Sequence, residues 1–495
     1  MSGFSLADGA RLIDAGTGKQ LDSKAINSKL LQWQTLLQGY GANRVVMTAD
    51  SSVNWVLADL ACLSANIMLT PLPTYLSGSQ KAAVLHTLQP DLWLSDHDIT
   101  DSDCSLLEEF DGLLLYRRAV TGSVVVPEGT QKITFTSGST GSPKGVCLST
   151  RSQLDVALAL KARVEHICTG LPRHLCLLPL PTLLENIAGV YAPLLAGGEV
   201  IIAADAIRGF SGSRLSEPKA MLALISNCQP KSLIVVPELL KMLIGAAHQG
   251  WKVPQSLEFI AVGGAYVSSQ VLQQASAVGL PVYQGYGLSE CASVVALSDA
   301  LPSEAGDSVG LPLACRDVQI IDGELVVNTP FLGYLGEVGS AKTQVFTGDL
   351  AQWTAQGGLR ILGRRKNLLI NSFGRNISPE WVESVLTDSG AILQAMLLGE
   401  AQPYCSALIF AAPSVTDTEL AAAVQRVNNK LPDYARVVHY CRLSAPFSTA
   451  QGTLTDNGRL KREAIMQQYS NTITELFSQQ NDITGEKYEL LSISA

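Results

Sequence analysis

Short apolar runs and amphipathic stretches alternate along most of the chain. Apolar positions recur at helical spacing in four stretches, 23–38, 52–65, 152–164 and 238–247. Between them lie apolar runs of strand length, at 44–47, 67–69, 175–180, 233–237 and 259–262. Strands that alternate with helices predict a mostly parallel sheet covered by helices, so the fold class is expected to be α/β.

The C-terminal third has a different pattern. Strand-like segments fill 309–335, and Asp322-Gly323 between two of them predicts a hairpin turn. The Ser-Pro-Glu at 378–380 has a cap, a first-turn proline and a first-turn acid, so a helix is expected to begin there. Another helix is expected over 464–480, and the last fifteen residues are predicted to be a loose tail.

Composition narrows the class of protein. A chain of 495 residues is expected to form more than one domain, and 47% hydrophobic with 16% charged residues is typical of a globular protein. A formal net charge of −9 without a basic stripe argues against nucleic-acid binding. The apolar stretch 56–72 is interrupted by Asp59, Ser64 and Asn66, so it predicts buried structure and no integral membrane segment.

The cysteines and the N-terminal residues indicate the cellular compartment in which the protein is expected. Ten scattered cysteines without a C-x-x-C pair suggest free thiols in a reducing environment, not a zinc site or a disulfide framework. The first residues lack the basic and apolar segments of a signal peptide. A cytoplasmic protein is therefore expected, and the isolated His86 and His97 are interpreted as ordinary histidines and not as metal ligands.

One stretch, 132–149, carries the most specific chemistry. A strand-like K-I-T-F-T leads into a run of hydroxyls and glycines and then Pro143 and Lys144. Glycines expose backbone N–H groups, hydroxyls add donors and the lysine adds positive charge, which together suit a polyphosphate. A plain surface loop is the alternative, and no Gly-Lys-Ser/Thr sequence makes it a Walker A loop. The residues predicted to hold phosphate are Thr136, Ser137, Gly138, Ser139, Thr140, Gly141 and Lys144.

T-S-G-S-T-G-S-P-K-G closely resembles the phosphate loop of the adenylate-forming superfamily, which includes acyl-CoA synthetases, luciferases and peptide-synthetase adenylation domains. The resemblance covers most of the chain, since further motifs follow in the family's order. It implies a large N-terminal domain of stacked α/β sheets with a β-barrel-like subdomain (1–364). A small mobile α+β C-terminal lid domain (365–495) would follow.

The resemblance assigns a nucleotide site. The strand-ending Gly263-Gly264-Ala265 segment would lie against adenine. In G-Y-G-L-S-E, Tyr286 would stack on adenine next to Gly287, Ser289 would bond the α-phosphate, and Glu290 would coordinate Mg²⁺. Asp349 of T-G-D-L would accept the ribose hydroxyls, and Arg364 would reach the ribose and phosphate.

The acyl pocket matches the family only in part. L-P-L-x-x-x-x-E resembles the fatty-acid members, although Thr182 stands where they have a histidine. No F-D-x-S stretch is present to hold an amino acid. An apolar pocket is expected for a fatty acid, with an aryl acid as the alternative. The predicted pocket residues are Thr182, Leu184, Glu185, Ala188, Gly264 and Gly285.

The small domain is expected to serve two half-reactions. Lys366 stands at the family's hinge position, and the turn with Ser372, Gly374 and Arg375 would form a tunnel for the thiol arm. In T-D-N-G-R-L-K-R, Arg459 stands where the family has its adenylation lysine, and Lys461 lies two residues on. Because a guanidinium and an ammonium are not equivalent, either cation could act in adenylation.

The sequence therefore predicts an ATP-dependent, Mg²⁺-requiring acid–thiol ligase. A carboxylic acid would form acyl-AMP, with Glu290, Lys144 and a C-terminal cation offsetting charge on the phosphates. A thiol, from coenzyme A or from the phosphopantetheine of an acyl carrier protein, would then take the acyl group. A degenerate nucleotide-binding member with little activity is the second hypothesis, and a kinase-like enzyme is discounted because its motifs are lacking.

Overall fold

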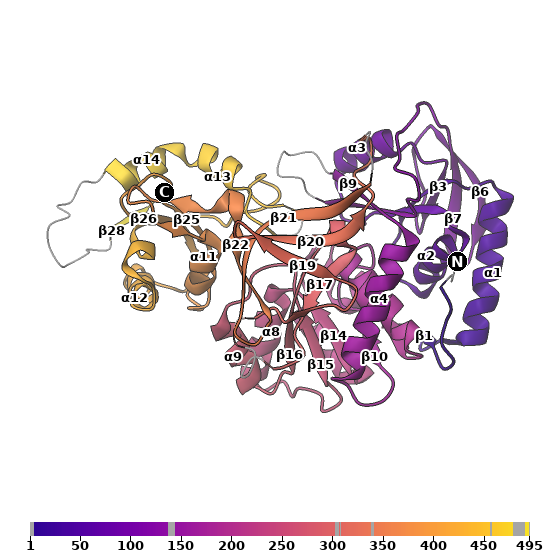
Figure 1. The fold of residues 1–495 in the computed structure, drawn as a ribbon, viewed down its shortest axis with the longest axis horizontal. Helices are drawn as coiled ribbons and strands as arrows, with labels where there is room; N and C mark the ends of the chain where they lie inside the picture. Colours follow the sequence, from indigo (N-terminus) through magenta and orange to yellow (C-terminus); the bar gives the residue numbers. More distant parts are fainter. Residues whose placement is uncertain are drawn as a thin grey trace.

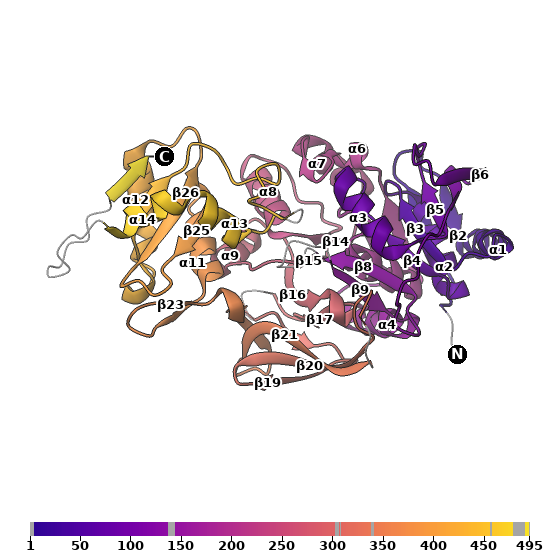
Figure 2. The same ribbon diagram turned by 90° about the horizontal axis from the view of Figure 1, so that it is seen from above.

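The computed structural model describes residues 4–136, 144–301, 306, 308–337, 341–455, 458–478 and 491–494. The larger N-terminal part contains three sheets of four or more strands, and a smaller C-terminal domain lies at one end of the molecule (Figure 1). Figures 1 and 2 both place this domain next to α8 (Pro237–His248) and α9 (Ser269–Ala277), at the end opposite α1 (Ser23–Gly39). The predicted α/β class with a separate small domain is confirmed.

The first sheet is formed by the N-terminal residues. Its strands in spatial order are β6 (Cys104–Phe110), β7 (Leu113–Arg118), β5 (Leu92–Ser95), β3 (Arg44–Thr48), β4 (Met68–Pro71), β8 (Lys132–Thr136) and β9 (Lys144–Leu148). Its helices are α1, α2 (Val53–Ala65) and α3 (Gly78–Leu88). The Ser52 side chain caps α2 by accepting from the Trp55 N–H at 3.1 Å. Strand pairing is parallel among β3, β4, β5 and β8, as the alternating pattern predicts.

The second sheet positions most of the site. Its strands in spatial order are β18 (Leu311–Pro312), β17 (Ser293–Leu297), β16 (Val282–Leu288), β15 (Phe259–Val262), β14 (Ser232–Val235), β10 (Arg173–Leu175), β11 (Glu199–Ile202), β1 (Arg11–Asp14) and β2 (Gln20–Asp22). The apolar side chains of α7 (Pro218–Cys228), α8 and α9 pack against one face. The other face meets α4 (Thr150–Glu165) and the π-helix η1 (Glu185–Tyr191).

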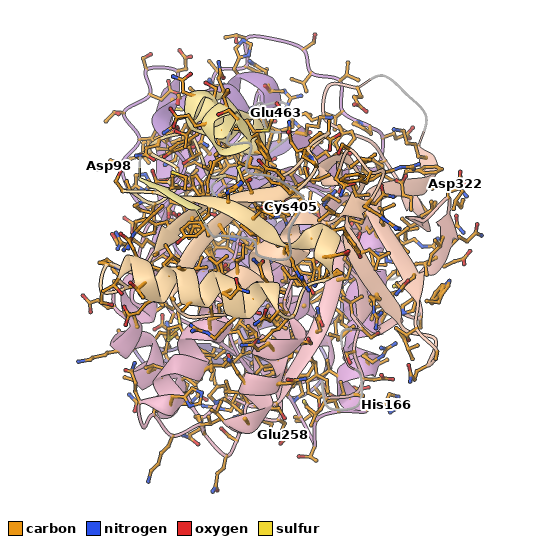
Figure 3. The ribbon with its side chains drawn as sticks, turned by 90° about the vertical axis from the view of Figure 1, so that its left-hand side faces the viewer. Asp98, His166, Glu258, Asp322, Cys405 and Glu463 are labelled. Carbon is orange, nitrogen blue, oxygen red and sulfur yellow. The ribbon has the colours of Figure 1, made fainter. Side chains whose placement is uncertain are left out.

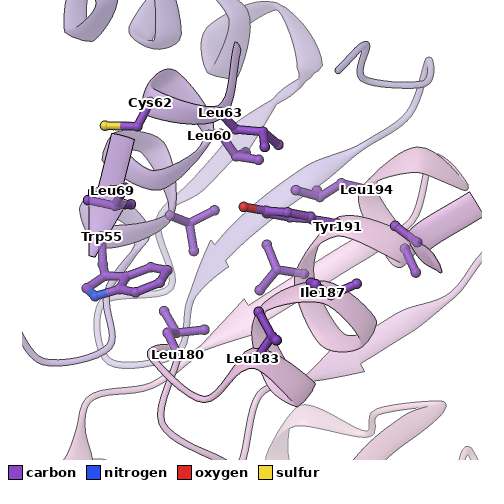
Figure 4. Close-up of a cluster of buried hydrophobic side chains, with 14 of the residues drawn as sticks. Trp55, Leu60, Cys62, Leu63, Leu69, Leu180, Leu183, Ile187, Tyr191 and Leu194 are labelled. Atoms are coloured by element: carbon purple, nitrogen blue, oxygen red, sulfur yellow. The ribbon is translucent and has the colours of Figure 1, made fainter. Parts of the chain in front are cut away.

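The main core lies between these two sheets. In Figure 4, Trp55, Leu60 and Leu63 of α2 point toward Ile187 and Tyr191 of η1. Burying one such side chain contributes roughly 1.5–3 kcal/mol. This packing connects the first sheet, which α2 covers, to η1, the helix that lines the site.

The remaining elements of the large part are short helices and an antiparallel sheet. The helical elements are α5 (Ala192–Leu195), α6 (Asp205–Arg208) and the 3-10 turn η2 (Ser289–Cys291). The strands β12 (Phe210–Ser211) and β13 (Arg214–Leu215) form a small hairpin. The sheet contains β19 (Asp317–Ile321), β20 (Glu324–Phe331), β21 (Lys342–Trp353) and β22 (Leu359–Arg364). The predicted hairpin turn is confirmed, since Asp322 (φ 49°) and Gly323 (φ 78°) join β19 to β20 in the left-handed conformation that such turns need.

The small domain has its own sheet and core. Its elements are η3 (Arg365–Asn367), β23 (Leu369–Ile370), β24 (Asn376–Ile377), α11 (Pro379–Thr387), β25 (Ile392–Leu398), β26 (Cys405–Ala411), α12 (Asp417–Asn428), η4 (Asp433–Ala435), β27 (Val437–Arg442), α13 (Arg462–Gln468), α14 (Ser470–Ser478) and β28 (Leu491–Ser494). Figure 3 looks onto this domain, with Cys405 in its sheet and Glu463 on α13 near the top. Helix α11 begins after Ser378, as predicted.

Three expectations need correction. The strand predicted over 175–180 ends at Leu175, because the N–H of Leu178 donates to a Glu185 side-chain oxygen (2.8 Å) instead of to a neighbouring strand. The helix predicted over 464–480 is divided at Tyr469, whose backbone (φ −105°, ψ 24°) is not helical. The tail is not wholly loose, since β28 pairs in parallel with β27. No helix in the described ranges is long and apolar enough to cross a membrane.

Candidate active site

A cleft of about 2420 Å³ lies between the large part and the small domain. Four parts of the chain line it: the β8–β9 hairpin, the ends of β15 and β16, the antiparallel sheet β19–β22 (the third sheet), and the segment before α13. The predicted nucleotide and catalytic residues that line it are Thr136, Lys144, Gly263, Gly264, Ala265, Tyr286, Gly287, Ser289, Glu290, Asp349, Arg364, Arg459 and Lys461, and the predicted hinge residue Lys366 lines it too. Residues far apart in the chain therefore share one cavity.

Asp349 is the centre of a cluster of polar side chains that line the cleft. Its side chain is nearly buried and accepts from Arg364 Nε (2.8 Å) on one oxygen and from the Tyr286 hydroxyl (2.5 Å) on the other. Burial raises the pKa of Asp349 above its ordinary value, against the opposing effects of Arg364 and Tyr286. The carboxylate is thus held in one orientation, with an arginine beside it that can meet an anion.

Glu290 has a comparable partner. The Tyr334 hydroxyl donates to Glu290 Oε1 at 2.8 Å, and Lys144 Nζ lies 5.2 Å from the centre of the Tyr334 ring. Burial and the Glu290 carboxylate together raise the pKa of Tyr334, so this hydroxyl keeps its proton and remains a donor. An acid at the hydroxyl of Tyr334 and a lysine over its ring are thus brought near each other, which suits a phosphate together with a hard cation.

The glycines here are required by close backbone approach. A Cβ on Gly287 would lie 1.8 Å from the Ser293 carbonyl oxygen, so no other residue fits without movement of the backbone. A Cβ on Gly263 would lie 3.3 Å from the carbonyl oxygen of Gly285. Glycine backbone therefore forms part of the cleft wall where β15 and β16 end.

Of the two cations left open by the sequence, Arg459 contacts the nucleotide side of the cleft. Its Nη2 donates to the Gly264 carbonyl oxygen at 2.6 Å. Desolvation and the nearby Arg364 lower the pKa of Arg459, while Asp349 opposes them. Lys461 also borders the cleft as the N-cap residue of α13. Both residues are exposed, so the hydrogen bond to Gly264 is what distinguishes Arg459.

The small domain is held in this orientation by polar contacts with α8 and α9. Asp388 after α11 accepts from the Ser268 hydroxyl and lies 3.7 Å from Lys241 Nζ. Lys430 Nζ donates to Gln270 Oε1 at 2.9 Å. In this orientation the Arg459 segment lines the cleft.

The predicted thiol-tunnel residues lie elsewhere. Ser372, Gly374 and Arg375 form an exposed turn that does not line the cleft, with Gly374 at φ 73°. Asn371 Oδ1 accepts from the Arg375 N–H at 2.9 Å and shapes the turn. Lys366, the predicted hinge, lies in η3 between the third sheet and the small domain.

An apolar extension of the cleft runs along the second sheet. Thr182, Leu184, Ala188 and Gly285 line it, as does Gly264 nearer the nucleotide side, and their role as an acyl pocket stays a prediction. Glu185 does not line it. That side chain is fully buried in η1 and accepts from His174 Nε2 at 2.8 Å.

Sequence reasoning missed His174 and Ser232, which do line this extension. Their side chains are 3.0 Å apart (Nδ1 to Oγ) on adjacent strands, and both are buried. The available signal was a histidine inside the apolar run of β10 and a lone acid in the apolar η1. Burying either group without a partner is costly.

The central loop residues Ser137, Gly138, Ser139, Thr140 and Gly141 lie outside the described residues. The positions on either side of them are placed. Thr136 and Lys144 pair across the antiparallel β8–β9 hairpin, so the predicted phosphate loop is the connection between these two strands.

Two models of known protein families match this chain. A family model described as AMP-binding enzyme matches residues 34–348, and one described as AMP-binding enzyme C-terminal domain matches 366–481. The chain belongs to the AMP-binding enzyme family. This confirms the predicted adenylate-forming superfamily and an enzyme of the AMP-forming ligase type.

Named relatives of this AMP-binding enzyme differ in their substrates. The long-chain-fatty-acid–CoA ligase FadD15 of Mycobacterium bovis is 24% identical over 550 aligned residues, which cover 88% of each chain. A 2-succinylbenzoate–CoA ligase of Staphylococcus aureus is 26% identical over 410 residues, covering 73% of this chain and 79% of its own. The solved structure of the Bacillus subtilis O-succinylbenzoate coenzyme A synthetase with AMP has a TM-score of 0.70 at 20% identity, covering 98% of this chain and 97% of its own.

Proposed function

We propose that this AMP-binding enzyme is an ATP-dependent acid–CoA ligase. In the first half-reaction a carboxylate oxygen attacks the α-phosphorus of ATP, the bond to the bridging oxygen breaks, and pyrophosphate leaves. In the second, a thiol sulfur attacks the acyl carbonyl of the acyl-AMP, AMP leaves, and the thiol proton passes to solvent. The carrying observation is that Arg459, Arg364 and Lys144 line one cleft with Asp349 and Glu290, beside an apolar extension.

The residues of the cleft fit ATP and Mg²⁺. Three cations can offset the charge of a triphosphate, and the Asp349 carboxylate can accept from the hydroxyls of a ribose. Glu290 offers oxygen ligands of the kind that Mg²⁺ prefers, and the metal would supply further charge neutralisation on the phosphates. The Bacillus subtilis synthetase has also been solved with ATP and a magnesium ion.

For the acid we propose a fatty acid of medium or long chain. The extension beside the nucleotide site is lined by apolar or small side chains, such as Ile234 and Ala261 from the sheet, Ala188 from η1 and Leu184 just before it. The fatty-acid ligase among the relatives favours the same class. An aryl acid is the second candidate, favoured by the 2-succinylbenzoate ligases among the relatives.

The small domain would alternate between the two half-reactions. We propose that it comprises 365–495 and turns about Lys366, which would exchange Arg459 for the Gly374 turn at the cleft. Coenzyme A is the proposed acceptor, and an acyl carrier protein is the alternative because both present the same pantetheine thiol. The ten free cysteines agree with a reducing compartment, and the cytosol is the proposed location.

Acid-dependent ATP–pyrophosphate exchange tests the proposal. A panel of fatty, aryl and amino acids is assayed, and thioester formation is then measured with coenzyme A and with a loaded carrier protein. Exchange confined to fatty acids, followed by acyl-CoA formation, is the expected result. If ATP binds and no acid supports exchange, the ligase proposal fails and a degenerate binder takes its place.

A further inference from the structure

We infer that Ser232, His174 and Glu185 form a subsite that binds a hydroxyl group on the distal part of the acyl chain. This inference rests on the proposed acid-ligase function and makes its substrate class narrower. The three residues form a continuous hydrogen-bonded relay, from Glu185 Oε1 to His174 Nε2 (2.8 Å) and from His174 Nδ1 to Ser232 Oγ (3.0 Å). Glu185 is 0% exposed, His174 is 2% exposed and Ser232 is 6% exposed.

The relay lies on the wall of the apolar extension. Because side chains alternate along a strand, Ser232, Ile234 and Val236 share one face of the sheet, and all three line the cavity. Val236, at the nucleotide end of this row, lies four steps along the chain from Ser232, a distance of about 13 Å at ~3.3 Å per residue. Because C–C bonds of about 1.5 Å zigzag, an extended chain advances about 1.3 Å per carbon and would reach Ser232 with about ten carbon atoms.

The protons of the relay determine which group it can bind. Both carboxylate oxygens of Glu185 are acceptors in use, one from His174 and one from the Leu178 N–H at 2.8 Å. A carboxylate cannot donate, so Nε2 of His174 carries a proton, and in the neutral imidazole Nδ1 is then the acceptor for the Ser232 hydroxyl. Ser232 Oγ then has lone pairs free for a donor. A hydroxyl satisfies it, whereas a methyl, a carbonyl or a carboxylate does not.

The π-helix makes room for this relay. A Cβ on Gly189 would lie 2.2 Å from Glu185 Oε1 and 2.6 Å from His174 Nε2. The glycine thus allows the acid and the histidine to meet beneath the pocket wall. Cys176 lies beside them, and one ligand atom from each of the three residues falls within 4.8 Å of the others. Since the carboxylate and both ring nitrogens already have protein partners, a relay describes the group better than a metal site.

The test compares pairs of acids of equal length, about ten carbons, that end in a methyl or carry a hydroxyl or an oxo group at the distal end. Pyrophosphate exchange gives kcat/KM for wild type, Ser232→Ala, Ser232→Thr and the matched control Ile234→Val. The wild type is expected to prefer the hydroxy acid at least about tenfold, the discrimination that one buried hydrogen bond provides. Ser232→Ala should remove this preference, Ser232→Thr should restore it, and Ile234→Val should affect all acids alike.

Other outcomes separate the two proposals. Equal wild-type exchange with the hydroxy and the unsubstituted acid, equal effects of Ser232→Ala on both acids, or a preference for the oxo acid would overturn the hydroxyl subsite and leave the ligase proposal intact. A purely structural role for Ser232 would lower activity with both acids together. Absence of exchange with every acid, the hydroxy acids included, would overturn both proposals.

Discussion

Arg459 Nη2 lies 2.6 Å from the carbonyl oxygen of Gly264, although 195 positions separate the two residues in the chain. The contact joins the segment before α13 to the wall predicted to hold adenine. Lys461, two residues further on, has its N–H bound to the Thr453 carbonyl at 2.9 Å, so its backbone is tied within the small domain. The structure therefore favours Arg459 as the cation that enters the adenylation site.

Arg459→Ala is expected to slow acid-dependent pyrophosphate exchange by about 100-fold, the usual loss when one charge-stabilising donor is removed. Lys461→Ala, the matched control, should lose no more than a few-fold. Thioester formation from supplied acyl-AMP should be retained in both, because the Arg459 segment would have left the cleft by then. The reverse ranking of the two variants in exchange would show that Lys461 acts instead.

Tyr334→Phe is expected to lower the affinity for Mg²⁺, so that exchange needs a higher Mg²⁺ concentration. The variant loses the 2.8 Å hydrogen bond that orients Glu290 and keeps the ring beside Lys144. Loss of such a supporting partner usually costs about 10- to 100-fold in metal affinity or activity. Titration of exchange activity with Mg²⁺ measures the effect, and Tyr116→Phe serves as a control distant from the predicted metal ligand. An unchanged Mg²⁺ midpoint would show that Tyr334 does not position Glu290.

Lys132 should be important for stability. Its buried Nζ contacts Asp59 Oδ1 (2.7 Å), Asn186 Oδ1 (2.5 Å) and the Tyr191 hydroxyl (2.7 Å), which joins β8 to α2 and η1. Lys132→Met leaves the Asp59 charge buried without a cation, so the free energy of unfolding should fall by about 3–5 kcal/mol.

The double variant Lys132→Met/Asp59→Leu removes both charges of this pair. It should be less destabilised than Lys132→Met alone, because no unpaired charge remains. Urea denaturation followed by fluorescence measures the wild type, the single variants Lys132→Met and Asp59→Leu, and the double variant. A double variant that is as unstable as the sum of its two single variants would contradict coupling of this pair.

Nucleotide binding should depend on pH through Asp349. Because burial raises its pKa, the folded protein binds this proton more tightly than the unfolded chain, so acidification favours the fold at this site but removes the negative charge. AMP affinity should therefore fall as the pH decreases, with a midpoint above the ordinary value of 3.8. Calorimetric titration of wild type and Asp349→Asn should show the difference in affinity closing at acid pH. A constant difference across this range would exclude titration of Asp349 as the cause.

Local patterns in the sequence determined much of the fold. Helix α2 begins after its Ser52 cap, and β19 and β20 meet at Asp322-Gly323, because caps, turns and apolar periodicity act over a few residues. The same holds for the strand that enters the predicted phosphate loop. Its motif is continuous in sequence, so it could be predicted without knowledge of distant contacts.

Tertiary structure decided what depends on distant pairing. Local periodicity cannot show that Glu185 turns toward His174 and away from the pocket, or that β10 and β14 place His174 beside Ser232, 58 residues away. It could not choose between Arg459 and Lys461, because that choice depends on the docking of the small domain against α8 and α9. The sequence by itself determined the family and the elements that carry its motifs. The packing of those elements decided which side chains enter the cleft, since burial and charge pairing act through space.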